Sequence, residues 1–154
     1  MSFVRQPMSV SPEDFKKLEL SINDVKENGS EIRSIFENYY DEEIDIDWEV
    51  DAAVEAFSIL SSRWTIEILA TLYIIGESRF NQLRGLLRGI SSRTLSDKLT
   101  KCTENGLVER LVEDGPPIRV KYRLTDHGRN AGKLLSPLVA YMKIKHGRVM
   151  RNNA

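Results

Sequence analysis

The polar side chains of residues 91–101 have the types and spacing needed for noncovalent recognition. On a helical projection, at about 100° per residue, Arg93 and Asp97 lie nearly opposite an apolar stripe. The stripe consists of Leu95, Leu99 and Cys102, and further polar residues of the segment include Ser91, Ser92, Thr94, Ser96, Thr100 and Lys101. A guanidinium can donate two parallel hydrogen bonds to one planar acceptor, and hydroxyls both donate and accept. The segment therefore suits recognition of a polar or anionic partner.

Catalysis and metal binding have little support in the sequence. The chain has one cysteine and two histidines, His127 and His146, with no ligand pairs at zinc spacing. It has no G-x-x-x-x-G-K or G-x-G-x-x-G loop for phosphates. The acidic run of residues 41–51 lacks the glycine and the closing glutamate of a calcium loop. We therefore expect no enzyme activity, no cofactor and no metal site.

The recognition segment is expected to be a helix with clear ends. Ser91 can cap the backbone N–H groups of a helix that begins at Ser92. Asn105 and Gly106 supply a left-handed stop. The expected helix thus exposes its hydroxyls and cations along one side.

A second helix is expected to precede it across the turn Gly89-Ile90-Ser91. Asn81 is its expected N-cap, and Leu83, Leu86 and Leu87 are its inner residues. The two helices can pack through their leucines, which gives a helix-turn-helix.

A two-stranded hairpin is expected directly after this pair. Residues 107–112 and 119–125 are the strands, and residues 113–117 form a turn rich in Gly and Pro. In the second strand Val120, Tyr122 and Leu124 alternate with Arg119, Lys121 and Arg123. One face therefore meets the core while three cations point outward.

These pieces resemble the HxlR-type family of winged-helix regulators, relatives in fold of the MarR type, over about residues 54–141. The matching motifs, in order, are R-W-T (63–65), R-F-N-Q-L (79–83), G-I-S-S-R-T-L (89–95), N-G-L-V-E-R (105–110), V-K-Y-R-L-T (120–125) and D-H-G-R (126–129). Six motifs at the right spacing are specific together. The resemblance implies a mainly α fold with a small β hairpin (α+β), and a homodimeric, sequence-specific transcription regulator that binds double-stranded DNA.

Within that resemblance, the helix from Ser92 enters the major groove with its N-terminal residues. Arg93 can bind guanine O6 and N7. Asp97 either accepts from a cytosine amino group or holds Arg93, four residues before it, in one rotamer, and we favour the second role. The expected DNA-binding residues are Ser91, Ser92, Arg93, Thr94, Ser96, Asp97, Lys101, Arg119, Lys121 and Arg123, the last three as phosphate or minor-groove contacts of the wing.

Some relatives of this type sense oxidants through a cysteine near the start of the first scaffold helix. Asp51 occupies that position here, so this mechanism does not carry over. Cys102 is expected to be a buried packing residue. The sequence names no effector molecule.

Charge divides the chain into two halves. Residues 1–50 contain 13 Asp or Glu and 5 Lys or Arg, net −8, whereas the rest has net +7. A basic half favours a polyanionic partner, although a bipolar protein interface would show the same asymmetry. We expect an acidic helical extension (residues 1–50), a winged helix-turn-helix domain (51–148) and a flexible tail (149–154).

The extension is expected to be a helical hairpin. Its first helix begins after Ser11 and ends at Asn28-Gly29, and a second begins at Ser30. Residues 41–51 alternate acidic and apolar types, which predicts a linker strand. Residues 52–75 are expected to be helical with a break at Ser61-Ser62, where hydroxyls can cap a restart; Trp64 is expected in the core.

The last helix is expected to begin at Thr125-Asp126 and to kink or restart at Pro137. By resemblance, it pairs two subunits through apolar residues. These residues are Leu134, Leu138, Tyr141 and Met142. The basic tail from Lys143 is expected to fray.

No apolar run reaches the roughly 18 residues that span a bilayer, and the N-terminus lacks a secretory pattern. We therefore expect no membrane association and a cytoplasmic location, with nucleoid association when the protein is bound to DNA.

The alternative function is a winged-helix module for protein interaction that uses the acidic extension. A dependent hypothesis is that the extension either covers the recognition face and competes with DNA or completes the dimer.

Overall fold

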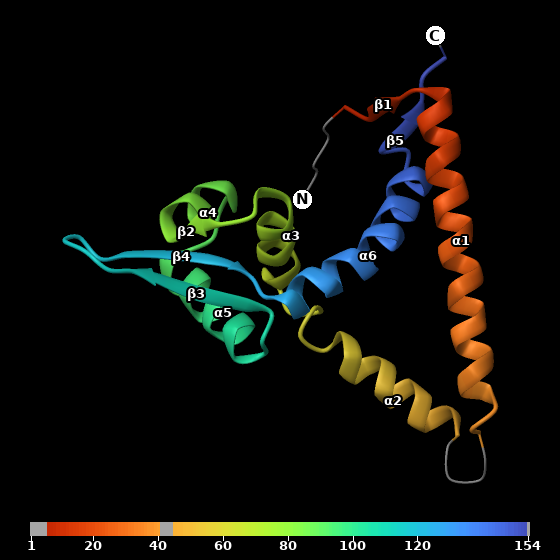
Figure 1. The fold of residues 1–154 in the computed structure, drawn as a ribbon, viewed down its shortest axis with the longest axis horizontal. Helices are drawn as coiled ribbons and strands as arrows, with labels where there is room; N and C mark the ends of the chain where they lie inside the picture. Colours follow the sequence, from red (N-terminus) through yellow and green to blue (C-terminus); the bar gives the residue numbers. More distant parts are fainter. Residues whose placement is uncertain (1–5, 41–44, 154) are drawn as a thin grey trace. The chain divides into compact units, whose positions relative to one another are not determined.

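A computed structural model describes residues 6–40 and 45–153 of the 154-residue chain. Helices dominate, and the strands form two small sheets (Figure 1), which confirms the expected α+β class. The elements are β1 (Met8–Val10), α1 (Pro12–Glu37), α2 (Ile46–Phe57), α3 (Thr65–Ile75), β2 (Ser78–Arg79), α4 (Phe80–Leu86), α5 (Ser92–Glu104), β3 (Val108–Glu113), β4 (Arg119–Leu124), α6 (Asp126–Lys145) and β5 (Val149–Arg151). The chain forms two units: residues 46–133, and residues up to 45 together with those from 134 onward.

The buried core belongs to the unit of residues 46–133. It is built from α3, α4, α5, β3, β4 and the turn between α4 and α5, and comprises Ile68, Leu72, Leu83, Leu87, Ile90, Leu95, Leu99, Cys102, Leu107, Val108 and Leu124. Trp64 is partly buried against this cluster, as expected. Leu86 was also expected to face inward, and this is wrong: it is 53% exposed. Of the residues of short α4, only Leu83 is buried.

The helix-turn-helix is formed by α4 and α5. Helix α5 begins at Ser92 with Ser91 as its N-cap, as expected, and buries Leu95, Leu99 and Cys102. Its end at Asn105 is followed by Gly106 at φ +72°, the left-handed conformation that glycine adopts without strain. The N-cap of α4 is Arg79 rather than Asn81, and no side chain caps it. Ser78, which is buried, begins the short strand that leads into α4.

The wing is a three-stranded sheet, where the sequence predicted two strands. Its order is β2-β4-β3, with β4 antiparallel to both neighbours. The hairpin register places Glu109 opposite Arg123 and Glu113 opposite Arg119. The additional strand is only two residues long, too short for its alternation to be read from the sequence.

Two predictions about the segment before α3 are wrong. Residues from Ile46 form α2 rather than a linker strand. The helix is favoured because its apolar residues also recur at helical spacing, at Ile46, Val50, Val54 and Phe57. Two acidic residues in its first turn further stabilise the helix N-terminus. The predictions for residues 41–44 fall outside the described residues. The hydroxyls of Ser61 and Ser62 do not cap α3, whose N-cap is Trp64 at φ +74°.

The junction between the wing and α6 is closely packed. The Thr125 N–H donates to the Leu107 carbonyl over 3.0 Å, and Thr125 Oγ1 accepts from the Gly128 N–H over 3.0 Å. Arg129 Nη1 donates to the Leu124 carbonyl over 2.9 Å. The D-H-G-R motif thus fixes the start of α6, which then continues through Pro137 to Lys145.

In the other unit, one long helix replaces the helical hairpin that the sequence predicted. Helix α1 runs without interruption through Asn28 and Gly29. Ser30 Oγ donates to the Lys26 carbonyl over 3.1 Å, so this hydroxyl bonds inside the helix instead of capping a new one. Glycine inside a helix costs only about 1 kcal/mol, which flanking turns can offset.

The C-terminal segment is paired instead of frayed. Strand β5 lies parallel to β1, with Met8 opposite Val149 and Val10 opposite Arg151. The Asn152 N–H donates to the Val10 carbonyl over 2.7 Å. The prediction that the tail from Lys143 frays is therefore wrong for β5, because backbone pairing with β1 orders it.

Candidate nucleic-acid interface

The outer side of α5 is solvent-accessible, as the sequence predicted. Ser91, Ser92, Arg93, Ser96, Asp97 and Lys101 are exposed, and Thr94 is half-buried. This side carries polar and charged groups directly above a fully buried stripe. The geometry presents a helix whose N-terminal half can enter a groove without unfolding any part of the core.

Two of the predicted contact residues have a structural task at the start of α5. Ser91 Oγ accepts from the Thr94 N–H over 3.1 Å and donates to Thr94 Oγ1 over 2.9 Å. The pair satisfies a backbone donor that the first helical turn leaves without an intrahelical partner. Ser91 and Thr94 therefore fix where α5 begins, and Ser92 and Arg93 are the first outward-facing side chains.

Arg93 and Asp97 lie one turn apart on the exposed side, but no ion pair joins them in the described part of the chain. The favoured role of Asp97, holding Arg93 in one rotamer, therefore gains no support from this structure and stays a prediction. Both side chains are exposed, where an i,i+4 pair stabilises a helix by only about 0.3–0.5 kcal/mol. Solvation outweighs so weak an attraction.

Lys98, one residue further along α5, was not predicted as a site residue. Its half-buried side chain donates to Ser62 Oγ, in the segment between α2 and α3. Because Lys98 faces this loop, it braces α5 against the scaffold. Its position three residues after Leu95 could have indicated an inward-leaning side chain.

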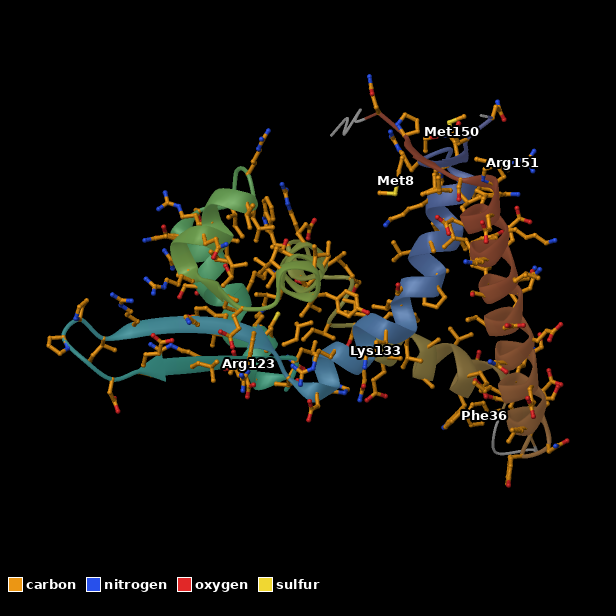
Figure 2. The ribbon with its side chains drawn as sticks, turned by 45° about the horizontal axis from the view of Figure 1, so that its top comes forward. Met8, Phe36, Arg123, Lys133, Met150 and Arg151 are labelled. Atoms are coloured by element: carbon orange, nitrogen blue, oxygen red, sulfur yellow. The ribbon has the colours of Figure 1, made fainter. Side chains whose placement is uncertain are left out.

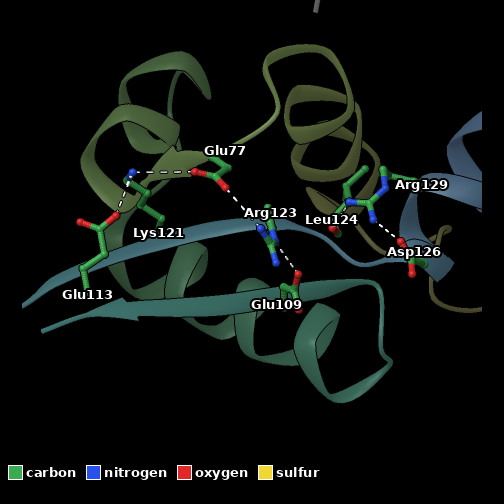
Figure 3. A network of polar contacts seen from close by, with 8 residues as sticks. All are labelled: Glu77, Glu109, Glu113, Lys121, Arg123, Leu124, Asp126 and Arg129. Carbon is green, nitrogen blue, oxygen red and sulfur yellow. Dashed lines mark hydrogen bonds and ion pairs between the residues drawn. The ribbon is translucent and has the colours of Figure 1, made fainter.

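Two of the three predicted wing cations, Lys121 and Arg123, are paired with carboxylates (Figure 3). Lys121 Nζ lies 2.9 Å from Glu113 Oε1 and 3.7 Å from Glu77 Oε2. Arg123 Nε donates to Glu109 Oε1, and Arg123 Nη1 lies 3.4 Å from Glu77 Oε1. Glu77 thus connects the two cations, so the outward face of β4 carries an acid–base cluster instead of bare positive charge. We call Glu77, Glu109, Glu113, Lys121 and Arg123 the wing cluster.

Electrostatics within the wing cluster favour the ionised forms of Glu113 and Arg123. The hydrogen bond from Lys121, together with its charge, lowers the pKa of Glu113 below the usual value, and Arg79 and Arg119 add to this effect. The hydrogen bond and charge of Glu109 raise the pKa of Arg123, and Glu77 acts in the same direction. Arg119 is exposed, opposite Glu113 near the wing turn.

Sequence reasoning missed all three carboxylates of the wing cluster. The strand register could have revealed two of them, because hairpin pairing sets Glu109 opposite Arg123 and Glu113 opposite Arg119. Glu77 gave no such signal, since it is 46 residues from Arg123 in the chain. Three exposed cations, Arg79, Arg84 and Arg88, also flank the helix-turn-helix and were not predicted.

The predicted dimer residues of α6 are all exposed. Leu134, Leu138, Tyr141 and Met142 are 79%, 47%, 40% and 45% exposed. Apolar side chains also project from α1, among them Phe36, which is 56% exposed (Figure 2). No residue of α1, all of which the structure describes, is buried. Two helices of this unit thus present uncovered apolar side chains.

The single cysteine is buried in the core, as expected. Cys102 is 1% exposed, and burial raises the pKa of its thiol although Lys98 opposes this effect. Within the described ranges, no three His, Cys, Asp or Glu side chains are grouped so that they could hold a metal ion. No described helix is long and apolar enough to cross a membrane.

Relatives with similar sequences are described as transcriptional regulators. The chain is 34% identical over 84 residues to the HTH-type transcriptional regulator YvaP of Bacillus subtilis. This match covers 54% of this chain and 77% of YvaP. It is 36% identical over 73 residues to the regulator YodB of the same organism, covering 47% of this chain and 64% of YodB. It is 35% identical to the Mycobacterium bovis regulator Mb3122, and spans 58% of that protein's length and 62% of its own.

Solved structures show the same fold. The reduced form of YodB from B. subtilis matches with a TM-score of 0.54 and 28% identity, over 65% of this chain and 92% of that one. A MarR-family regulator from Enterococcus faecalis V583 matches with a TM-score of 0.57 and 27% identity, over 69% of this chain and 93% of that one. The expected winged-helix class is thereby confirmed.

The family match covers the elements that carry the candidate interface. The sequence model of a family described as HxlR-like helix-turn-helix matches residues 59–149, more than half of the chain. This range includes all of α3 to α6, and therefore the helix-turn-helix and the wing. Residues before it, including α1 and α2, lie outside the match. The chain belongs to the HxlR-like helix-turn-helix family of DNA-binding transcriptional regulators.

Proposed function

We propose that this protein is a homodimeric, sequence-specific regulator that binds double-stranded DNA with α5 in the major groove. The observation that carries the proposal is the exposed polar side of α5 above its buried stripe. The relatives' descriptions as HTH-type transcriptional regulators support the same reading. The division into an acidic extension, residues 1–50, and a DNA-binding region, residues 51–148, is part of this proposal.

Base recognition is assigned to the N-terminal half of α5. Ser92, Arg93, Ser96 and Asp97 are the exposed residues of its first two turns. Arg93 binds guanine O6 and N7 through two hydrogen bonds. Because Asp97 has no ion pair with Arg93, we assign it the other role that its carboxylate permits, accepting from a cytosine amino group.

Affinity is assigned to cations around the helix-turn-helix. Lys101 extends the exposed side of α5, and Arg119 lies in the wing near its turn. Lys121 and Arg123 contact phosphate after leaving their carboxylates. Arg84 and Arg88, next to the turn before α5, are placed to contact the backbone that the first helix of such a motif crosses.

Dimerisation is assigned to α6. Leu134, Leu138, Tyr141 and Met142 recur at four- and three-residue spacing and share one exposed side. A dimer would place two copies of α5 in successive major grooves, which predicts two half-sites about 10 base pairs apart or a multiple of that spacing.

Selection of genomic fragments by the purified protein, followed by titration of the selected duplex, tests the proposal. The log of the binding constant should fall linearly with log salt. Arg93→Ala should weaken binding about 10- to 100-fold, because one bidentate base contact contributes about 1–3 kcal/mol. Arg33→Ala, on the acidic helix α1, removes the same charge and should leave affinity nearly unchanged. Duplex binding that responds to neither salt nor Arg93→Ala would contradict the proposal.

A second candidate function, protein interaction through the extension, is favoured by one observation. Helix α1 is 26 residues long and, with every residue described, buries none of them. A pull-down that recovers a protein through residues 1–50, together with absent DNA binding in a gel shift, would support this function instead.

A further inference from the structure

The wing holds its own counter-charges. Two cations of β4, Lys121 and Arg123, face three carboxylates from β3 and from the segment before β2. Glu77 contacts both cations, as Figure 3 shows, while Glu109 and Glu113 contact one each. In the absence of DNA, two of the positive groups that would bind phosphate are therefore already occupied.

We propose that Glu77, Glu109 and Glu113 compete with DNA phosphates for Lys121 and Arg123, and so set the affinity and the salt dependence of DNA binding. The inference rests on the proposed function, because it concerns the same DNA-binding surface. It assigns to three acidic residues a regulatory role at a basic wing.

Partial exposure allows this exchange to occur. The side chains of Lys121 and Arg123 are 30% and 42% exposed, and the three carboxylates are 40–46% exposed. Water and salt reach such pairs, which makes each of them weak. An incoming phosphate can therefore displace a carboxylate without any change in the fold.

Each exchange also alters the ion balance. A cation that moves onto phosphate releases a condensed counterion from the DNA. The carboxylate that it leaves attracts a cation from solution, which offsets part of that release. The wild-type salt slope should therefore be shallower than the number of phosphate contacts alone implies.

The opposite role is also physically possible and gives the opposite result. The carboxylates could hold Lys121 and Arg123 in the orientation in which they meet DNA. Removing a carboxylate would then disorder its cation and weaken binding. Measuring the direction of the effect distinguishes competition from positioning.

Glu109→Gln is the decisive variant. Glu109 contacts Arg123, and glutamine has the shape of glutamate without its charge. Its control is Asp114→Asn, in the turn of the same hairpin; no ion pair of the described residues involves Asp114. Both variants remove one negative charge from the wing, but only the first removes a carboxylate that contacts Arg123, which keeps its contact with Glu77. Circular dichroism and thermal melting verify that both fold.

Binding is measured by fluorescence anisotropy on a mixed-sequence duplex of about 30 base pairs and on the selected duplex, across a salt series. Glu109→Gln should bind about two- to fivefold tighter at physiological salt, since one exposed pair is removed. Its salt slope should steepen by up to about one ion. Asp114→Asn should change both quantities less.

A double-mutant cycle with Arg123→Gln completes the test. The loss of affinity caused by Arg123→Gln should be larger in the Glu109→Gln background than in the wild type, because there only Glu77 still competes for the guanidinium. Unchanged or weaker binding by Glu109→Gln, or an equal gain in Asp114→Asn, would overturn the inference. If the wild type binds neither duplex, the proposed function itself fails.

Discussion

At the scale of single residues, Glu113 reports whether its pair with Lys121 exists in solution. The hydrogen bond and charge of Lys121 lower the pKa of Glu113, so the pair is present above the carboxyl's ordinary pKa and is lost as pH falls through the lowered value. Lys121→Met should raise the pKa of Glu113 toward its ordinary value. Carboxyl chemical shifts followed by NMR across a pH titration measure the change. Asp114, in the adjacent turn, should titrate alike in both proteins.

A pKa of Glu113 that is unaltered by Lys121→Met would show that the contact does not persist in solution. The melting temperature should change little in this variant, because both partners are partly solvent-accessible and such pairs are weak. The prediction is independent of DNA, so it tests the wing cluster separately from its proposed competition with phosphate.

At the scale of elements, the contact between the start of α6 and the wing depends on one glycine. A Cβ on Gly128 would lie 2.2 Å from the Leu107 carbonyl oxygen, a backbone atom that also accepts from the Thr125 N–H. Gly128→Ala must therefore push α6 away from the wing. We expect a loss of about 1–3 kcal/mol in the free energy of unfolding, as for overpacked cores. Urea denaturation measures it.

Two other glycines serve as matched controls for Gly128. A Cβ on Gly85 in α4 meets no atom within 4 Å, so Gly85→Ala should be neutral or stabilising, by up to about 1 kcal/mol. A Cβ on Gly132 would meet the ring of Tyr73, which is 40% exposed and can move aside. The free energy of unfolding of Gly132→Ala should therefore lie between those of Gly128→Ala and Gly85→Ala. Equal stability of all three variants would contradict this account of the junction.

At the scale of the whole molecule, the exposed apolar residues of α6 predict that folding is linked to association. If two copies pair through this helix, the melting temperature of the wild type should rise with protein concentration. Leu138→Glu should remove that dependence and halve the mass measured by light scattering. Ser136→Glu adds the same charge at an exposed position of the same helix, about 200° away around the helix axis, and should preserve the dimer.

A wild-type mass of one chain, with a concentration-independent melting temperature, would remove the homodimer from the proposed function. The DNA-binding part of the proposal would remain, because the exposed side of α5 belongs to one chain. Residues 1–50 can be examined in the same way: their deletion should tighten DNA binding if the extension competes with DNA, and should lower the mass if it completes the dimer.

Local patterns determined much of this protein. The ends of α5 follow from Ser91 and Gly106, and its buried stripe follows from apolar residues at three- and four-residue spacing. The alternation along β4 likewise placed Lys121 and Arg123 on one face. These features depend on neighbours within a few residues, so the sequence alone specifies them.

Tertiary structure decided which groups meet across long stretches of chain. Glu77 reaches Arg123 only because β2 pairs with β4, and no local pattern encodes that pairing. Helix α1 continues through Gly29 and β5 pairs with β1, although local turn and tail signals indicated otherwise. Backbone hydrogen bonds and strand register outweigh such weak local preferences. The sequence therefore specified the exposed polar side of α5, while the fold determined that Lys121 and Arg123 are held by carboxylates.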